Sequence, residues 1–114
     1  MEITFQQAIV AHNKGRLEEA EGLYRDILEV QPIHPDVNNN LGVLLASLGR
    51  LDEAEECYRK AIKFKTNYAE PYHNLSITLN NCGKFDEAEA NSRKAIELKP
   101  DYVDAYNNLG NVLK

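Results

Sequence analysis

The chain has 114 residues, a formal net charge of −5, 43% hydrophobic residues and 27% charged residues. This length is enough for one domain that buries a core without help from metals or disulfides. The acidic balance leaves no basic stripe of the kind that binds a phosphate backbone, so nucleic acid is not an expected partner.

Neither a membrane span nor a signal segment is visible in the sequence. No apolar run approaches the length of a membrane helix, and the opening MEITF has neither a basic leader nor a hydrophobic signal core. We therefore expect a cytoplasmic protein with no membrane partner. Cys57 and Cys82 lie 25 residues apart with no CxxC pair and no histidine at ligand spacing. They are predicted to be free, mostly packed thiols, and we expect no metal and no other cofactor.

An internal repeat dominates the chain. Residues 15–21, 49–55 and 83–89 read GRLEEAE, GRLDEAE and GKFDEAE, at a spacing of 34 residues. Asn-Leu pairs recur at the same spacing, at residues 40–41, 74–75 and 108–109. A fixed period in this range is the signature of a repeat array, in which neighbouring units stack to bury a continuous core.

Each period is predicted to form two helices, taken here in chain order. Residues 1–34 are the first repeat, with helices over about 2–14 and 18–31; residues 35–68 are the second, with helices over about 36–48 and 52–65. Residues 69–102 are the third, with helices over about 70–82 and 86–99, and residues 103–114 hold the first helix of a fourth, over about 104–114. Gly15, Gly49 and Gly83 are predicted to end the first helices, because glycine enters a left-handed C-terminal cap without a Cβ penalty.

Small and aromatic residues mark the expected helix contacts. Ala20, Ala54 and Ala88 stand near the start of each second helix, where a larger side chain would push the helix pair apart. Tyr24 and Tyr58 are predicted to be core residues rather than binding residues.

These features resemble the tetratricopeptide repeat family, whose pattern has a small residue at position 8, Ala at 20, an aromatic residue at 24, a small residue at 27 and Pro at 32. The chain departs from this pattern at Ile27, Thr66 and Ser92. The resemblance implies an all-α, right-handed superhelical solenoid of antiparallel hairpins, with three full repeats plus one extra helix, and a scaffold role in which the first helices line a concave groove.

The sequence also suggests where a partner would bind. Asn40, Asn74 and Asn108 share position 6 of the repeat, and a primary amide can both donate to and accept from a peptide backbone. Such a ladder is similar to that of the O-linked N-acetylglucosamine transferase repeats, where asparagines hold an extended peptide. The alternative is that these amides only make hydrogen bonds between hairpins. The predicted partner-binding residues are Asn39, Asn40, Glu70, His73, Asn74, Asp104, Asn107, Asn108 and Asn111. For His73 the alternative is a partly exposed surface histidine.

The charge of the expected groove disfavours an acidic ligand. Family members that clamp the acidic tails of heat-shock chaperones carry Lys or Arg at positions 2, 5 and 6, whereas position 2 is acidic throughout this chain. The acidic residues at this position are Glu2, Asp36, Glu70 and Asp104. We therefore expect a protein or extended peptide that is neutral or basic.

No candidate nucleophile has a base at a useful spacing, so we predict a protein-protein interaction scaffold and not an enzyme. Two alternatives remain. The chain is a segment of a longer protein and presents substrate to a downstream glycosyltransferase, sulfotransferase or methyltransferase domain, or else arrays associate end to end through Leu109, Val112 and Leu113 of the exposed C-terminal helix.

Overall fold

The computed structural model describes residues 4–114 and contains seven α-helices in that range, with no strand among the described residues. Their bounds are α1 (Phe5–Asn13), α2 (Leu17–Val30), α3 (Pro35–Ser47), α4 (Leu51–Phe64), α5 (Ala69–Asn81), α6 (Phe85–Leu98) and α7 (Val103–Val112). The predicted start of the first helix at residue 2, and the acidic residue Glu2, lie outside the described residues. The other predicted helices begin and end within two residues of the observed bounds.

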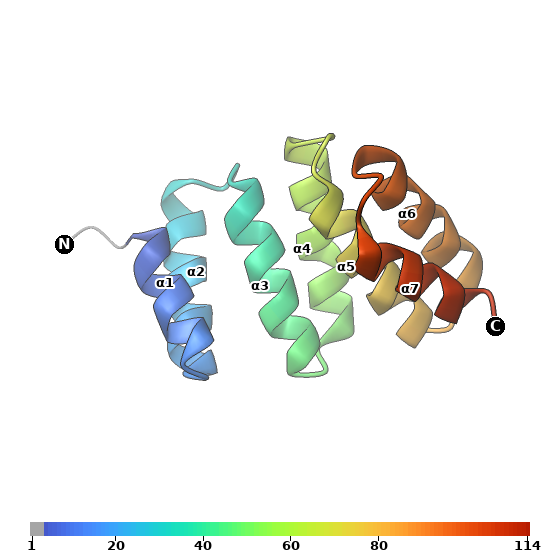
Figure 1. The fold of residues 1–114 in the computed structure, drawn as a ribbon. Coiled ribbons are helices and arrows are strands. Elements are labelled where there is room, and N and C mark those ends of the chain that lie inside the picture. The colour runs from blue at the N-terminus through green and yellow to red at the C-terminus, as the bar shows by residue number, and fades with distance from the viewer. Residues whose placement is uncertain (1–3) are drawn as a thin grey trace.

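The helices form three antiparallel hairpins followed by α7. α1 pairs with α2, α3 with α4 and α5 with α6, and the hairpins follow one another from left to right in Figure 1. Each second helix packs on the first helix of the next hairpin, so the described chain is elongated, with extents of 47 × 26 × 21 Å. The fold is an all-α helical repeat solenoid.

Each hairpin turn depends on a glycine. Gly15, Gly49 and Gly83 all have φ near 78°, a left-handed conformation that other residues enter only at a cost. The chain can then close the cap: the amide of Arg50, for example, donates to the carbonyl of Leu45 over 2.9 Å. The glycine caps predicted from the repeat are therefore confirmed.

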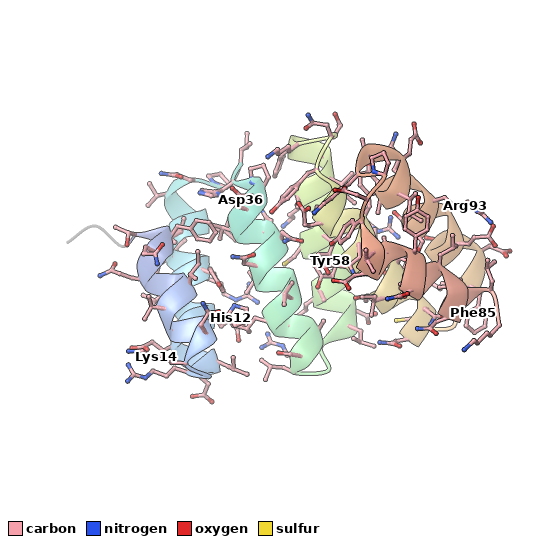
Figure 2. All side chains as sticks on the ribbon, in the orientation of Figure 1. His12, Lys14, Asp36, Tyr58, Phe85 and Arg93 are labelled. Atoms are coloured by element: carbon pink, nitrogen blue, oxygen red, sulfur yellow. The ribbon has the colours of Figure 1, made fainter. Side chains whose placement is uncertain are left out.

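The core follows the repeat register. Ala20, Ala54 and Ala88 are fully buried, as predicted, and Tyr24 and Tyr58 are buried core residues. In Figure 2, Tyr58 lies in the middle of the array. One prediction is wrong: Cys57 is buried, but Cys82 is exposed, because it is the C-cap residue of α5 beside the glycine turn.

The small residue at position 8 and the residue at position 24 are matched in size. Gly42 leaves room for the Tyr58 ring, since a Cβ on Gly42 would lie 2.6 Å from a ring carbon. In the third repeat both positions are serine, and the Oγ atoms of Ser76 and Ser92 lie 2.6 Å apart. The space left by the missing ring is filled by Asn108, whose Nδ2 donates to both serines at 2.8 Å.

Ion pairs cross both interfaces between the three full repeats in the same pattern. Between the first two repeats, Arg50 pairs with Glu21 at 2.8 Å and Arg25 pairs with Glu53 at 3.4 Å. Between the second and third repeats the pairs are Lys84 with Glu55 at 3.4 Å and Arg59 with Glu87 at 3.1 Å. A base at position 16 and an acid at position 19 therefore meet an acid at position 21 and a base at position 25 of the preceding repeat.

Candidate partner-binding site

The face carried by the first helices α3, α5 and α7 holds the predicted binding residues. A cavity of about 360 Å³ lies between α5 and α7, and we call it the α5–α7 cavity. It is lined by His73, Ile77, Asn80, Asn81, Asp104, Asn107, Asn108 and Asn111. The structure therefore brings together five of the nine residues predicted from the sequence and adds three that were not.

The three added residues follow from helical spacing. Ile77, Asn80 and Asn81 occupy positions 9, 12 and 13 of the third repeat, one and two turns beyond His73 on the same helix. The predicted residues occupied positions 2, 5 and 6, with position 9 included only at Asn111, so these three residues of α5 were missed. The signal was present, since residues three or four apart share a helix face.

His73 is the most deeply placed polar residue of the cavity for which the structure gives no internal partner. It is only 8% exposed, so the expectation of a partly exposed surface histidine is wrong. Its Nδ1 atom is buried without a hydrogen-bond partner among the described residues, and its ring lies 4.9 Å from that of Tyr102. Burial lowers the pKa of His73, and the nearby carboxylates of Asp104 and Glu70 oppose that effect. The imidazole is thus held toward its neutral form.

Asn108 also lines the cavity but is largely engaged inside the protein. It is 8% exposed, and both hydrogens of its amide group are directed to serines of the third repeat. The amides of Asn107 and Asn111, on the same helix, are exposed. Free hydrogen-bonding capacity on α7 therefore resides mainly in Asn107 and Asn111.

The predicted residues outside the cavity form a second group along α3 and α5. Asn74 donates from Nδ2 to Oδ1 of the buried Asn39 over 3.1 Å, which joins positions 5 and 6 of consecutive repeats. Asn40 is half-buried and lies beside Tyr24, where its hydrogen bonding opposes the rise in the Tyr24 pKa that burial causes. These amides therefore take part in contacts within the solenoid.

The described acidic residues at position 2 have different surroundings. Asp36 and Asp104 are exposed, and Asp104 stands at the α5–α7 cavity. Glu70 lies 3.9 Å from Lys99, whose Nζ sits 4.7 Å above the ring of Tyr102. No lysine or arginine lines the α5–α7 cavity.

The described residues contain no group of three or more His, Cys, Asp and Glu side chains placed to hold a metal ion. Burial raises the pKa of Cys57 to about 11, which keeps this thiol protonated and a poor nucleophile near neutral pH. Among the described helices, none combines the length and apolar character needed to cross a bilayer.

The apolar residues of α7 are covered to different extents. Val112 packs against the core, Leu109 is half-buried and Leu113 is 55% exposed. Association of arrays through these three residues stays a prediction.

Comparison with known proteins identifies the family to which this repeat architecture belongs. Family models described as tetratricopeptide repeat match residues 5–69 and 57–90, and one described as TPR repeat matches residues 78–114. No curated protein is significantly similar in sequence. The fold is that of a helical-repeat protein. The chain belongs to the tetratricopeptide repeat family, whose members are generally non-catalytic interaction modules.

Solved structures share the fold. The first such repeat domain of Spaghetti (RPAP3), bound to the HSP90 peptide SRMEEVD, has a TM-score of 0.92 at 20% identity and covers 95% of this chain and 86% of that one. The second domain of human RPAP3, in complex with the HSP70 peptide SGPTIEEVD, has a TM-score of 0.90 at 18% identity and covers 96% and 91%. An O-GlcNAc transferase from Thermobaculum terrenum has a TM-score of 0.88 at 25% identity, and 93% of this chain covers 20% of that one.

Proposed function

We propose that the chain is an interaction module that holds an extended, neutral or basic segment of another protein along the face of α3, α5 and α7, and that it catalyses nothing itself. The observation that carries this proposal is the α5–α7 cavity, in which five asparagines surround one apolar side chain. The structural relatives with bound chaperone peptides support a peptide ligand for a fold of this kind.

The chemistry of the cavity suits a peptide main chain. Each primary amide offers a carbonyl oxygen and an NH₂ group, which match the N–H and C=O groups of an extended backbone. Ile77 is 38% exposed among these amides and would contact an apolar side chain of the ligand. Asn107 and Asn111 provide the exposed amides, one helical turn apart on α7.

Charge supports a ligand different from the peptides in the relatives. SRMEEVD and SGPTIEEVD each carry several carboxylates. In this chain the α5–α7 cavity includes Asp104 and no lysine or arginine, and Asp36 is a further exposed carboxylate at position 2. Like charges across an interface are unfavourable, so an acidic tail would bind more weakly than a neutral or basic segment.

The test is a peptide-display selection on the chain, repeated on an Asn107→Ala/Asn111→Ala double variant. These two residues are exposed, so their loss does not disturb the Ser76, Ser92 and Asn108 network. We expect a shared motif without acidic residues, and roughly tenfold weaker binding by the double variant, because two amide contacts of about 0.5–1.5 kcal/mol are removed. The matched control, Asn13→Ala/Asn91→Ala, changes two asparagines that do not line the cavity.

Equal binding by all three proteins, or selection of acidic peptides, would contradict the proposal. Binding that is lost in the control pair as well would place the contact elsewhere on the solenoid. Circular dichroism of each variant verifies that the helices are retained.

A second candidate function is the substrate-presenting arm of a larger transferase. The observation in its favour is the likeness to the O-GlcNAc transferase from Thermobaculum terrenum, of which this chain covers 20%. The test is the length of the natural gene product, measured by mass spectrometry of the native protein. A product that continues into a glycosyltransferase, sulfotransferase or methyltransferase domain is the expected result, and a product confined to these repeats would exclude it.

A further inference from the structure

A larger cavity, about 640 Å³, lies at the opposite end of the solenoid between α1 and α2, and we call it the α1–α2 cavity. It is lined by Thr4, Gln6, Gln7, Val10, Ala11, Arg16, Glu19 and Leu23. Val10 is 41% exposed there, although the residues at the equivalent position of α3 and α5 are buried. None of these residues belongs to the face of α3, α5 and α7.

The same repeat positions are covered in the later repeats. Position 10 is Val10, Leu44 and Thr78 in turn, and its exposure falls from 41% to 0% and 1%. Position 7 is an exposed glutamine in the first repeat and a leucine that is 1% exposed, Leu41 or Leu75, in the next two. What covers these positions is the second helix of the preceding hairpin, since α2 packs on α3 and α4 packs on α5. The α1–α2 cavity is therefore the place where a helix equivalent to α2 would lie.

The charges at the cavity specify what that helix would carry. Arg16 and Glu19 are the first-repeat equivalents of Arg50 and Glu53, which pair across an interface with Glu21 and Arg25 of α2. In the first repeat the side chains of Arg16 and Glu19 are 63% and 55% exposed. They form a long ion pair with each other, at 3.8 Å. A helix with a glutamate and, four residues later, an arginine would reproduce both crossed pairs.

We propose that the α1–α2 cavity is a docking site for one amphipathic helix of a partner protein, a helix that carries the pattern of α2: an apolar stripe flanked by an acid and, four residues later, a base. The apolar stripe covers Val10, Ala11 and Leu23, its acid pairs with Arg16 and its base pairs with Glu19. This site is separate from the α5–α7 cavity, and a helix bound here leaves that cavity open.

The experiment uses a synthetic peptide with the sequence of residues 17–30, held helical by a hydrocarbon crosslink on its polar side, because a free helix of this length is marginal in water. The peptide is titrated into the ¹⁵N-labelled chain and amide shifts are recorded. We expect shifts at Val10, Ala11 and Glu19 and none at Asn107 or Asn111. Fluorescence anisotropy supplies the dissociation constant.

A charge exchange tests the crossed pairs. The variant Arg16→Glu/Glu19→Arg should bind the peptide at least tenfold more weakly, and a peptide with its own glutamate and arginine exchanged at the equivalent positions should restore binding. The matched control Lys14→Glu/Glu18→Lys exchanges two nearby exposed charges outside the cavity and should bind like the unchanged chain.

Three results would overturn the proposal: no shifts at millimolar peptide, shifts at Asn107 and Asn111 instead, or a failure of the exchanged peptide to restore binding. Sedimentation of the chain alone tests whether a second copy of the chain occupies the cavity. A dimer whose dissociation on dilution shifts Val10 and Leu23 would show that a second copy occupies the cavity, and would likewise overturn it.

Discussion

Glycine and tyrosine are fitted to each other at one point in the core of the second repeat. Gly42 and Gly110 both occupy position 8, but only Gly42 faces a tyrosine ring, whereas a Cβ on Gly110 would meet nothing within 4 Å. The same residue type at the same repeat position therefore has two different physical reasons. One glycine avoids a steric clash, and the other only forgoes helix propensity.

Substitution of the two glycines should have opposite effects. Gly42→Ala places a methyl group 2.6 Å from the Tyr58 ring and should lower the free energy of unfolding by about 1–3 kcal/mol. Gly110→Ala should raise it by about 0.5–1 kcal/mol, because alanine favours the helix and finds open space. Urea unfolding followed by circular dichroism measures both. Equal effects of the two variants would contradict this account of the packing.

Asn108 should likewise behave as a structural residue. Asn108→Ala removes the buried amide that donates to the Oγ atoms of both Ser76 and Ser92, and we expect a loss of about 1–3 kcal/mol of unfolding free energy. Asn111→Ala removes only an exposed amide and should change stability by less than about 0.5 kcal/mol. A silent Asn108→Ala variant would show that the network contributes nothing to folding. Thermal melting of the two variants side by side distinguishes these outcomes.

At the scale of the element, the helices differ in how their N-termini are completed. α1 begins with a capping box in which Thr4 Oγ1 accepts from the amide of Gln7 at 3.2 Å, and Gln7 Oε1 accepts from the amide of Thr4 at 2.9 Å. α2, α4 and α6 have no side-chain cap and begin directly after the glycine turn. Two side-chain hydrogen bonds therefore fix the start of α1.

Removal of that cap should loosen α1 selectively. Thr4→Ala should cost about 0.5–2 kcal/mol, because an amide of the first turn loses its acceptor. Hydrogen exchange should quicken for amides of α1 and stay unchanged for α5. Thr4→Ser keeps the hydroxyl and serves as the control. If Thr4→Ala lowered protection in all helices, including α5, while Thr4→Ser did not, the effect of the cap would not be confined to α1.

The helices themselves are the part of the structure that the sequence predicted best. Periodic apolar residues, first-turn acids and hairpin glycines act locally, so their signal survives without knowledge of neighbours. The side-chain network of Ser76, Ser92 and Asn108 joins residues up to 32 apart and was visible only as a departure from the family pattern at Ser92. The burial of His73 was missed for the same reason, since it depends on Tyr102 from the next repeat.

At the scale of the whole molecule, the buried His73 and the half-buried His12 couple stability to pH. Burial lowers the pKa of His73 and of His12 below the ordinary value of 6.5. The unfolded chain therefore takes up these protons more readily than the folded one. The contribution of these neutral histidines to the free energy of unfolding is present in full above pH 6.5. It is lost as the pH falls from 6.5 through their folded-state pKa values.

Replacement of His73 should weaken this dependence. The free energy of unfolding should fall between pH 7.5 and pH 5.5 in the unchanged chain, and should fall less in His73→Leu, where only His12 retains a lowered pKa of this kind. The range stays above the carboxylate region, in which Glu21 titrates with a pKa lowered by its hydrogen bond to Arg50. Urea unfolding at both pH values gives the comparison. An identical slope in the two proteins would exclude a role for His73.

The crossed ion pairs have a consequence for how such a chain changes over generations. Because the base at position 16 and the acid at position 19 recur in all three repeats, and each of the two interfaces uses them with the same signs, any 34-residue unit presents matching charges at both of its ends. A tandem duplication of one unit would therefore arrive already compatible with its neighbours. The array can be lengthened by copying DNA in frame, without compensating substitutions at the new junction.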